Sequence, residues 1–345
     1  MYNFINDYSE GAHENIINAL IKTNREQTVG YCEDEYCAKA AKLIQKELGH
    51  KRAVHFMVAG TQTNLTVISH VLRPYEGAIA PITGHINVHE SGAIEATGHK
   101  VLTVPTDNGK LTAGQVTEVM EEHLNNPTMI HMVRPGMVYI SLPTEIGTIY
   151  SKNELSAIYD ACKKYKIPLF IDGARLGCAL SAPKNDLTLK DLAELCDIFY
   201  IGGTKMGALF GEALVINNPK YDENFQYMQK QKGALLAKGR LLGIQFEQLF
   251  TDRLYYKLGE HAVSMAQKIQ NCLIENDYKL KITSDTNQLF PIFEDKALAA
   301  LEKEFTFEFW EKADRNHSTV RICTSWATEE AQVEKICSML TELKG

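Results

Sequence analysis

A lysine at position 205 follows an apolar run, where a charge is costly. It lies within the segment C-D-I-F-Y-I-G-G-T-K-M-G-A-L-F-G, which begins at Cys196 and sets the lysine among glycines. Burying an ammonium group is unfavourable unless the group is neutralised or used covalently. Asp172 closes a second apolar run, I-P-L-F-I-D. A lysine that forms a Schiff base and an acid that keeps a pyridine nitrogen protonated are the pair that pyridoxal phosphate chemistry needs. Two unrelated residues at strand ends would give the same pattern.

A short segment after the first predicted strand of the sheet could hold a phosphate. Gly60, Thr61 and Asn64 lie in A-G-T-Q-T-N, where a helix is predicted to begin. Glycine lets backbone amides approach an anion, the helix dipole favours it, and Thr61 and Asn64 can add side-chain donors, although a simple helix cap would look the same. Thr204 precedes Lys205, the reverse of the order in a P-loop. We therefore expect the Thr204 hydroxyl to donate to the phosphate of a cofactor.

Three further side chains have the chemistry to contact a cofactor or substrate. His85, in T-G-H-I-N-V-H-E, could stack on a pyridine ring and move protons, or could be a surface or helix-capping histidine. Arg175, in D-G-A-R, could direct its guanidinium to a phenolate or carboxylate, or form a strand-end salt bridge. Arg321 lies inside the apolar run T-V-R-I-C, where it needs either a substrate carboxylate held bidentately or a buried acidic partner. His89 would share a helix face with His85, but no third ligand indicates a metal site.

The composition excludes several other classes of protein. The chain has 345 residues, of which 45% are hydrophobic and 23% charged, as in ordinary globular proteins. A net charge of -7 argues against a nucleic-acid or anionic-membrane binder. Eight scattered cysteines fit free thiols in a reducing compartment better than a disulfide framework. No signal peptide or membrane-spanning segment is recognisable. We therefore expect a soluble, cytoplasmic protein without a metal.

The elements that must position these residues alternate as in an α/β protein. Apolar runs and helical patterns follow one another between residues 51 and 202, which predicts a mostly parallel sheet covered by helices. Thr128–Val133 could be an additional strand before Met137–Ser141. Long helices are predicted at Gln231–Phe250 and Leu254–Glu275, with short strands and helices beyond them. We therefore predict a large domain at 1–250, which starts with a helical segment at 1–30, and a small α+β domain at 251–345.

Seven segments, taken in order, resemble the threonine aldolase and aromatic amino acid β-eliminating lyase family of fold-type I pyridoxal phosphate enzymes. The resemblance runs nearly from end to end, and the ordered set is more specific than any one segment. The segments are G-Y-x-x-D at Gly30, G-T-x-x-N at Gly60, H-I…E at His85, T-E-I-G-T-I-Y at Thr144, I-D-G-A-R-L at Ile171, T-K-x-G at Thr204 and V-R-I-C-T at Val320. The resemblance implies a transferase-like large domain with a mostly parallel, seven-stranded sheet and a smaller α+β C-terminal domain.

The resemblance also implies roles for individual residues. Lys205 would form the Schiff base, Asp172 would pair with the pyridine nitrogen, and Arg175 would pair with the phenolate oxygen. The other implied contacts are Gly60, Thr61 and Thr204 at the phosphate, His85 on the ring, and Arg321 with Ser9 or its neighbours at the substrate α-carboxylate. Lys238 matches a basic residue that the family often sends to the phosphate of a neighbouring subunit. A homo-oligomer, either a dimer or a tetramer with sites at the subunit interface, is therefore implied.

The implied activity is cleavage of the Cα–Cβ bond of a β-hydroxy-α-amino acid (threonine, allo-threonine or a phenylserine-like compound) to glycine and an aldehyde. One segment departs from the family: Glu145-Ile146-Gly147 stands where many low-specificity threonine aldolases carry a histidine followed by Asn-Gly. A phenylserine-aldolase-like subgroup looks similar there. Glu145, His85 or a water that they position is then the base at the β-hydroxyl. The alternative is β-elimination or another lyase or racemase reaction on the same fold.

Overall fold

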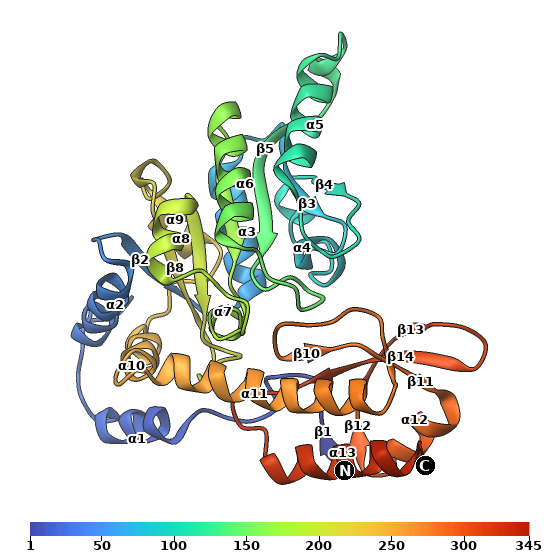
Figure 1. Ribbon diagram of the computed structural model, residues 1–345. Helices are drawn as coiled ribbons and strands as arrows, with labels where there is room; N and C mark the ends of the chain where they lie inside the picture. The colour runs from blue at the N-terminus through green and yellow to red at the C-terminus, as the bar shows by residue number, and fades with distance from the viewer. Residues whose placement is uncertain (345) are drawn as a thin grey trace.

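The computed structural model describes residues 1–344 and shows a large α/β part beside a smaller part (Figure 1). The strands of the large part are β2 (Ala53–Met57), β3 (Glu76–Pro81), β4 (Val101–Val104), β5 (Arg134–Ser141), β6 (Leu169–Asp172), β7 (Ile198–Gly202) and β8 (Glu212–Ile216). They form one sheet in the order β2-β8-β7-β6-β5-β3-β4. Strands β3 to β7 pair in parallel, whereas β8 is antiparallel to both neighbours. The predicted seven-stranded, mostly parallel sheet is therefore confirmed.

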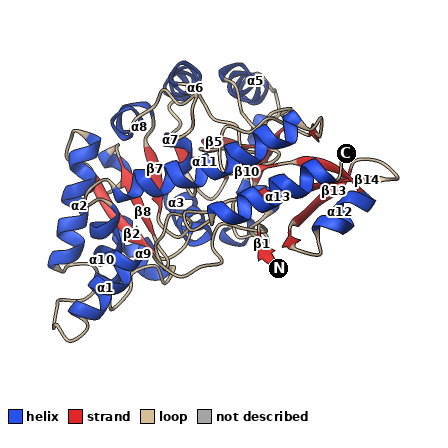
Figure 2. Ribbon diagram, turned by 60° about the horizontal axis from the view of Figure 1, so that its bottom comes forward, coloured by secondary structure: helices blue, strands red, loops and turns tan. Residues whose placement is uncertain are grey.

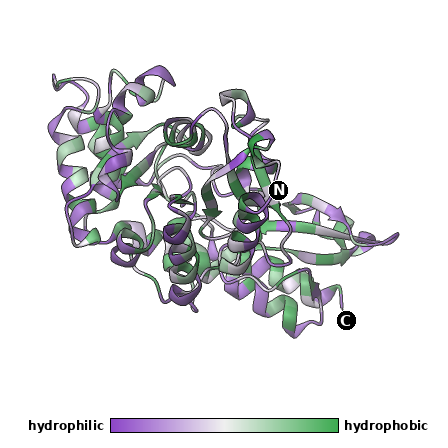
Figure 3. Cartoon of the chain, turned by 90° about the horizontal axis from the view of Figure 1, so that it is seen from above, coloured by the Kyte–Doolittle hydropathy of each residue, from purple (hydrophilic) through white to green (hydrophobic). Residues whose placement is uncertain are grey.

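Helices cover both faces of this sheet (Figure 2). One face carries α2 (Glu35–Leu48), α5 (Ala113–Leu124), α6 (Lys152–Tyr165), α8 (Leu189–Leu195) and α10 (Arg240–Leu249), and the other carries α3 (Gly60–Val71), α4 (His85–Val88) and α9 (Phe225–Gln231). Alternate side chains of a strand point to opposite faces, so Val138 and Ile140 pack in one core while Met137 and Tyr139 pack in the other. The central strands are accordingly hydrophobic, and the polar residues lie on the outer faces of the helices (Figure 3).

The smaller part combines an antiparallel sheet with helices. Helix α11 (Leu254–Glu275) leads into it and has the bounds that the sequence predicts. The other elements are β9 (Lys279–Leu280), β10 (Gln288–Leu289), β11 (Pro291–Glu294), α12 (Asp295–Leu301), β12 (Phe305–Thr306), β13 (Glu308–Lys312), β14 (His317–Cys323) and α13 (Glu330–Glu342). Strand β14 lies between β10 and β11 and also pairs with β13. This α+β arrangement was expected.

The N-terminal segment crosses to the smaller part before it enters the large one. Strand β1 (Tyr2–Asn3) pairs in parallel with β12, and Phe4 is fully buried against Phe305. Helix α1 (Glu14–Thr23) then packs Ile16 into the core of the large part. The residues between β1 and α1 are therefore held between the two parts, next to the cavity described below. Within residues 1–344, no helix has the length and apolar character needed to cross a membrane.

Two of the predicted elements are wrong. The helix expected over Gln231–Phe250 is interrupted, since α9 ends at Gln231 and α10 begins at Arg240. Gly233 has a φ of 72° in the break, a left-handed conformation that ends helices. The strand expected over Thr128–Val133 is a 3-10 turn at Met129–His131 followed by the start of β5. A short helix after β6, α7 (Leu176–Leu180), was not predicted.

Candidate active site

A cavity of about 520 Å³ lies beyond the carboxyl ends of β3, β5, β6 and β7. Open α/β sheets bind their ligands at this edge. The cavity is also lined by Tyr8 of the N-terminal segment and by Glu308 of the smaller part. Nine of the residues predicted from the sequence line it together: Gly60, Thr61, His85, Glu145, Asp172, Arg175, Thr204, Lys205 and Arg321. Residues that are far apart in the sequence thus meet at one place.

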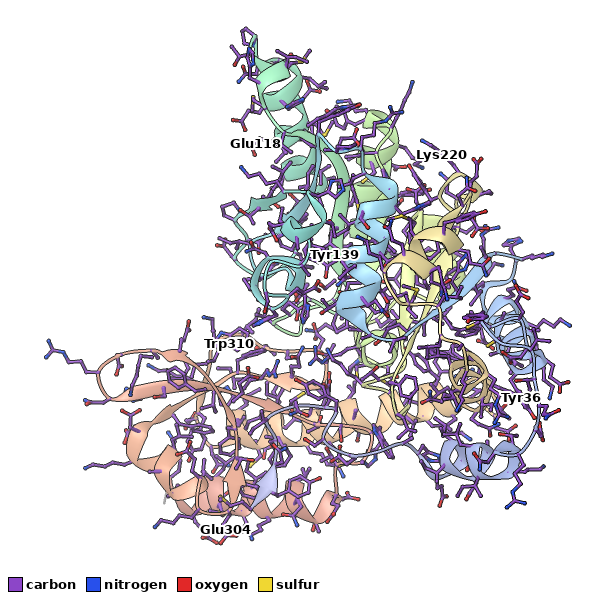
Figure 4. All side chains as sticks on the ribbon, turned by 180° about the vertical axis from the view of Figure 1, so that it is seen from behind. Tyr36, Glu118, Tyr139, Lys220, Glu304 and Trp310 are labelled. Atoms are coloured by element: carbon purple, nitrogen blue, oxygen red, sulfur yellow. The ribbon has the colours of Figure 1, made fainter. Side chains whose placement is uncertain are left out.

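Asp172 is the last residue of β6 and its side chain is buried. Tyr139 and Asn64 donate hydrogen bonds to its Oδ2 at 2.6 and 3.0 Å, and Tyr200 donates to its Oδ1. Tyr139 lies in the interior of the large part (Figure 4). Burial alone would raise the pKa of Asp172, but the nearby His85 and these hydrogen bonds outweigh it and lower the pKa. Asp172 is therefore a carboxylate held in one orientation, and it lines the cavity.

A second buried acid fixes His85. The imidazole Nδ1 donates to Glu90 Oε1 at 2.7 Å, and Asn64 donates to the same oxygen at 2.7 Å. Burial alone would lower the pKa of His85, but Glu90 and the nearby Glu145 outweigh it and raise the pKa above its usual value. Asn64 thus links two carboxylates, and its own Oδ1 is buried without a partner among the described residues. The ring of His85 is oriented by Glu90 rather than free on the surface.

Arg175 is held by an aspartate that the sequence analysis did not identify. Its Nε and Nη2 donate to the two oxygens of Asp7 at 2.6 and 3.1 Å. Asn287 also donates to Asp7, at 2.9 Å. Burial would raise the pKa of Asp7, but Arg175 outweighs it and lowers the pKa to about 2. The alternative of a salt bridge is therefore realised for Arg175, which nevertheless lines the cavity.

We expect replacement of Asp7 by asparagine to lower the free energy of unfolding by about 3–5 kcal/mol, because it leaves a buried guanidinium without its counter-ion. A carboxyl with a depressed pKa stabilises the fold above its unfolded pKa, near 4, and loses that contribution as the pH falls towards 2. The wild-type protein should therefore lose stability between these pH values more steeply than Asp7→Asn. Urea unfolding at several pH values measures both effects.

Asp107→Asn, at an exposed position, is the control for Asp7→Asn and should change the free energy of unfolding by less than about 0.5 kcal/mol. Equal, small changes in both variants would contradict the pairing.

Lys205 lies in the turn after β7 and reaches the cavity. Burial and the nearby Arg175 lower its pKa from the usual value, which favours the neutral amine that covalent chemistry requires. The Nζ lies 5.9 Å from the centre of the Tyr8 ring. Strand β7 pairs with β6, so the lysine and Asp172 reach the cavity from adjacent strands.

One end of the cavity is suited to an anion. Helix α3 begins there at Gly60, and its N-cap residue Ala59 supplies no side-chain hydrogen bond, so the first amides of the helix are left for a ligand. A Cβ at Gly60 would lie 3.1 Å from the Tyr200 hydroxyl, so a larger residue would crowd this end. The hydroxyl oxygen of Thr204 lies there too, 3.0 Å from Oε1 of the buried Glu212 side chain.

Arg321 lies on β14 and lines the same cavity. Its Nη1 donates to Gln288 at 3.1 Å and its Nη2 donates to the carbonyl of Ile5 at 3.0 Å. Its Nη2 also forms an ion pair with Glu308 on the paired strand β13. Of the two partners that the sequence allows for Arg321, a substrate carboxylate or a buried acid, the acid is therefore present as Glu308. The Nε of Arg321 is buried and has no hydrogen-bond partner within residues 1–344, so the guanidinium keeps one unused donor.

Glu145 and two histidines form a further group in the cavity. Ser141, the last residue of β5, donates to Glu145 Oε1 at 3.1 Å. The rings of His85 and His89 lie 5.5 Å apart, and all three groups line the cavity. Desolvation lowers the pKa of His89. Among residues 1–344, no cluster of three His, Cys, Asp or Glu side chains is arranged to hold a metal ion.

Three predicted site residues do not line the cavity. Asn64 is fully buried and donates to Glu90 and Asp172 instead. Ser9 is exposed and hydrogen-bonds to Asn3 and Asn6, and Lys238 is exposed in the break between α9 and α10. Five other residues at or next to the cavity were not predicted: Asp7, Tyr139, Tyr200, Glu212 and Glu308. A signal exists for the two tyrosines, because a hydroxyl inside an apolar strand usually has a buried partner. For the acids, the sequence gives no such signal.

The residues present fit pyridoxal phosphate. An oriented carboxylate suits a pyridinium nitrogen, an amine of lowered pKa suits the aldehyde, and the uncapped start of α3 suits the phosphate. The buried, unpartnered Oδ1 of Asn64 beside Asp172 is consistent with a missing polar ligand. Asp172, Lys205, His85 and the segment at Gly60 would therefore hold the cofactor.

Comparison with known proteins gives consistent results. The family model for beta-eliminating lyases matches residues 4–312. A low-specificity L-threonine aldolase from a Pseudomonas species is 31% identical over 93% of this chain and 91% of its own length. The solved threonine aldolase of Leishmania major is 47% identical, covers both chains completely and superposes with a TM-score of 0.97. The histidinol-phosphate aminotransferase of Clostridium acetobutylicum, at 12% identity over 100% of this chain and 99% of its own, has a TM-score of 0.74 and shares the fold alone. The expected fold-type I architecture is confirmed.

Proposed function

This chain belongs to the beta-eliminating lyase family, and we propose that it uses pyridoxal phosphate to cleave β-hydroxy-α-amino acids to glycine and an aldehyde. One observation carries the proposal: Asp172, a buried and oriented carboxylate, and Lys205, an amine of lowered pKa, reach one cavity from adjacent strands. When bound, the cofactor stores the electron pair that remains when a bond to Cα breaks. Two of the similar proteins are named threonine aldolases, so threonine is the first substrate to test.

We propose that Arg321 orients the substrate through its α-carboxylate. Its guanidinium lines the same cavity as Gly60 and Lys205 and keeps an unused Nε donor. Glu308 forms an ion pair with the Nη2 of Arg321. A substrate carboxylate has the same charge and shape as the Glu308 carboxylate, so it could replace Glu308 in this ion pair. Holding the carboxylate fixes the orientation of the Cα–Cβ bond, which is how positioning lowers a barrier. Ser9 remains a predicted helper from the N-terminal segment.

Glu145 is the proposed base at the substrate β-hydroxyl. It lines the cavity together with Arg321 and Lys205, and its carboxylate is oriented by Ser141. Cleavage requires that this hydroxyl loses its proton as the aldehyde forms. His85 is less available, since its Nδ1 is committed to Glu90.

Glu145→Gln should reduce the rate of cleavage by about 10²–10⁴-fold, the usual contribution of general acid–base catalysis. The visible absorbance of the bound cofactor should persist, because the hydrogen bond of Glu145 goes to Ser141 and not to the residues that would hold the cofactor. The rate is measured by aldehyde release, and Glu118→Gln, at an exposed position of α5, is the control. A Glu145→Gln enzyme with the wild-type rate would exclude this base.

The substrate range and the assembly complete the proposal. Because Glu145 replaces the histidine of many threonine aldolases, we propose that phenylserine-like substrates and allo-threonine are cleaved as well as threonine. Aldehyde release from a panel of β-hydroxy amino acids tests this range, and activity on threonine alone would refute it.

We also propose a homo-oligomer in which the exposed Lys238 reaches the phosphate site of a neighbouring copy. The cysteines are free, which fits the proposed cytoplasmic location.

A further inference from the structure

Glu212 is a buried acid that the functions described above do not use. It is the first residue of β8, its side chain is buried, and it lines the cavity beside Thr204. Its strand neighbours at this position, Met57 and Gly202, carry no charge. The charged groups that face it are Lys205 and Asp172, and within residues 1–344 none of the ion pairs includes it. Burial raises the pKa of Glu212 to about 8.

Other titratable groups near Glu212 do not supply a counter-charge. The phenols of Tyr200, on the neighbouring strand β7, and Tyr255, on α11, have pKa values well above the usual one because of burial. Both are therefore neutral at physiological pH. A carboxylate at position 212 would have only Lys205 to balance it, and that amine has a lowered pKa of its own. The surroundings of Glu212 thus favour its neutral form.

The hydrogen bonds at Glu212 show what its protonation changes. The amide of Gly203 donates to Oε2 at 3.0 Å, and the Thr204 hydroxyl lies 3.0 Å from Oε1. The amide of Gly211 donates to the same hydroxyl oxygen at 3.0 Å. A threonine hydroxyl has a single proton to donate. If Glu212 is ionised, that proton must point to Oε1, and the hydroxyl offers no donor to the cavity.

The neutral form reverses this bond. With its proton on Oε1, the Glu212 carboxyl donates to the Thr204 oxygen, and the Thr204 proton is free to point into the cavity. The Oε2 atom still accepts from Gly203 in either form. A dianion bound at this end would disfavour a second negative charge at Glu212 still further. The neutral carboxyl is therefore the form compatible with a bound phosphate.

We propose that Glu212 works as a protonated positioning residue, which donates to Thr204 so that the Thr204 hydroxyl can donate to the cofactor phosphate. The inference rests on the proposed placement of the phosphate beside Thr204. It goes beyond the family roles because it assigns the orientation of that hydroxyl to a second residue.

The test measures the dissociation constant of the cofactor from the reconstituted apoprotein between about pH 6.5 and 9.5. Wild-type affinity for pyridoxal phosphate should fall as the pH rises through about 8, by about tenfold to a hundredfold, as expected for loss of one hydrogen bond to a charged group. Glu212→Gln donates an amide hydrogen bond at every pH, so its affinity should lack this additional fall. Pyridoxal, which has no phosphate, should show no such fall with the wild-type protein, and this comparison needs no variant to fold.

Thr204→Val separates the inference from the proposed function. It should bind pyridoxal phosphate more weakly than wild type at neutral pH, and adding Glu212→Gln to it should change nothing further. If Thr204→Val binds as tightly as wild type, the phosphate does not lie where we propose. If it binds more weakly but wild type and Glu212→Gln show parallel pH profiles, or pyridoxal shows the same fall as its phosphate, the role of Glu212 is wrong while the cofactor site stands.

Discussion

Replacing Lys205 with alanine is expected to abolish turnover and to remove the visible absorbance of the lysine-bound cofactor. The amine at this position has a pKa lowered by burial and by Arg175, and no other lysine lines the cavity within the part of the chain that the structure describes. The loss should exceed about 10³-fold, as for removal of a residue that bonds covalently in other enzymes. Absorbance spectra and aldehyde release measure the two effects.

Lys205→Arg is the matched control for charge. It keeps a cation after β7 but removes the reactive amine, because a guanidinium is not deprotonated in proteins. We therefore expect the arginine and alanine variants to fail alike. An alanine variant that retained both absorbance and turnover would exclude covalent attachment at Lys205.

The second large effect is expected at Asp172. Asp172→Asn keeps the size of the side chain but removes the charge that would pair with the pyridinium nitrogen. We expect the rate of cleavage to fall by about 10²–10³-fold, the range that loss of one preorganised electrostatic contact costs. Cofactor binding should persist, because Lys205 and the segment at Gly60 remain. Rates measured at saturating cofactor separate this effect from weaker binding.

Tyr139→Phe is the control for this substitution. It removes the hydrogen bond to Asp172 Oδ2 at 2.6 Å but leaves the carboxylate and the bond from Asn64. Its effect on the rate should be much smaller than that of Asp172→Asn. Equal effects would show that the hydrogen-bond network, and not the charge, is what the reaction requires.

Much of the fold is predictable from the sequence because its signals are local. The capping box of Ser151 and Glu154, the buried run of β7 and the apolar face of α11 each specify an element without reference to the rest of the chain. The break before Arg240 is harder to predict, since Leu235 and Leu236 continue the apolar pattern across it. Strands β12 and β13 are short or half-exposed, so their sequences carry little alternation.

The site residues also divide into those that a local sequence motif predicts and those that only tertiary packing brings to the cavity. Lys205, Asp172 and His85 stand in motifs whose order along the chain is specific, and all three reach the cavity. Asp7 and Glu308 belong to segments that meet the site only through tertiary packing. Their roles depend on the path of the N-terminal segment and on the register of β13 with β14, which no local pattern records.

The most direct test of the central claim is the identity of the products formed from L-threonine by the purified enzyme with pyridoxal phosphate. Bond cleavage between Cα and Cβ predicts glycine and acetaldehyde in equal amounts, without ammonia. Ammonia together with a 2-oxo acid would show β-elimination instead, and a changed stereochemistry of intact threonine would show racemisation or epimerisation. Either result, in place of glycine, would contradict the proposed function.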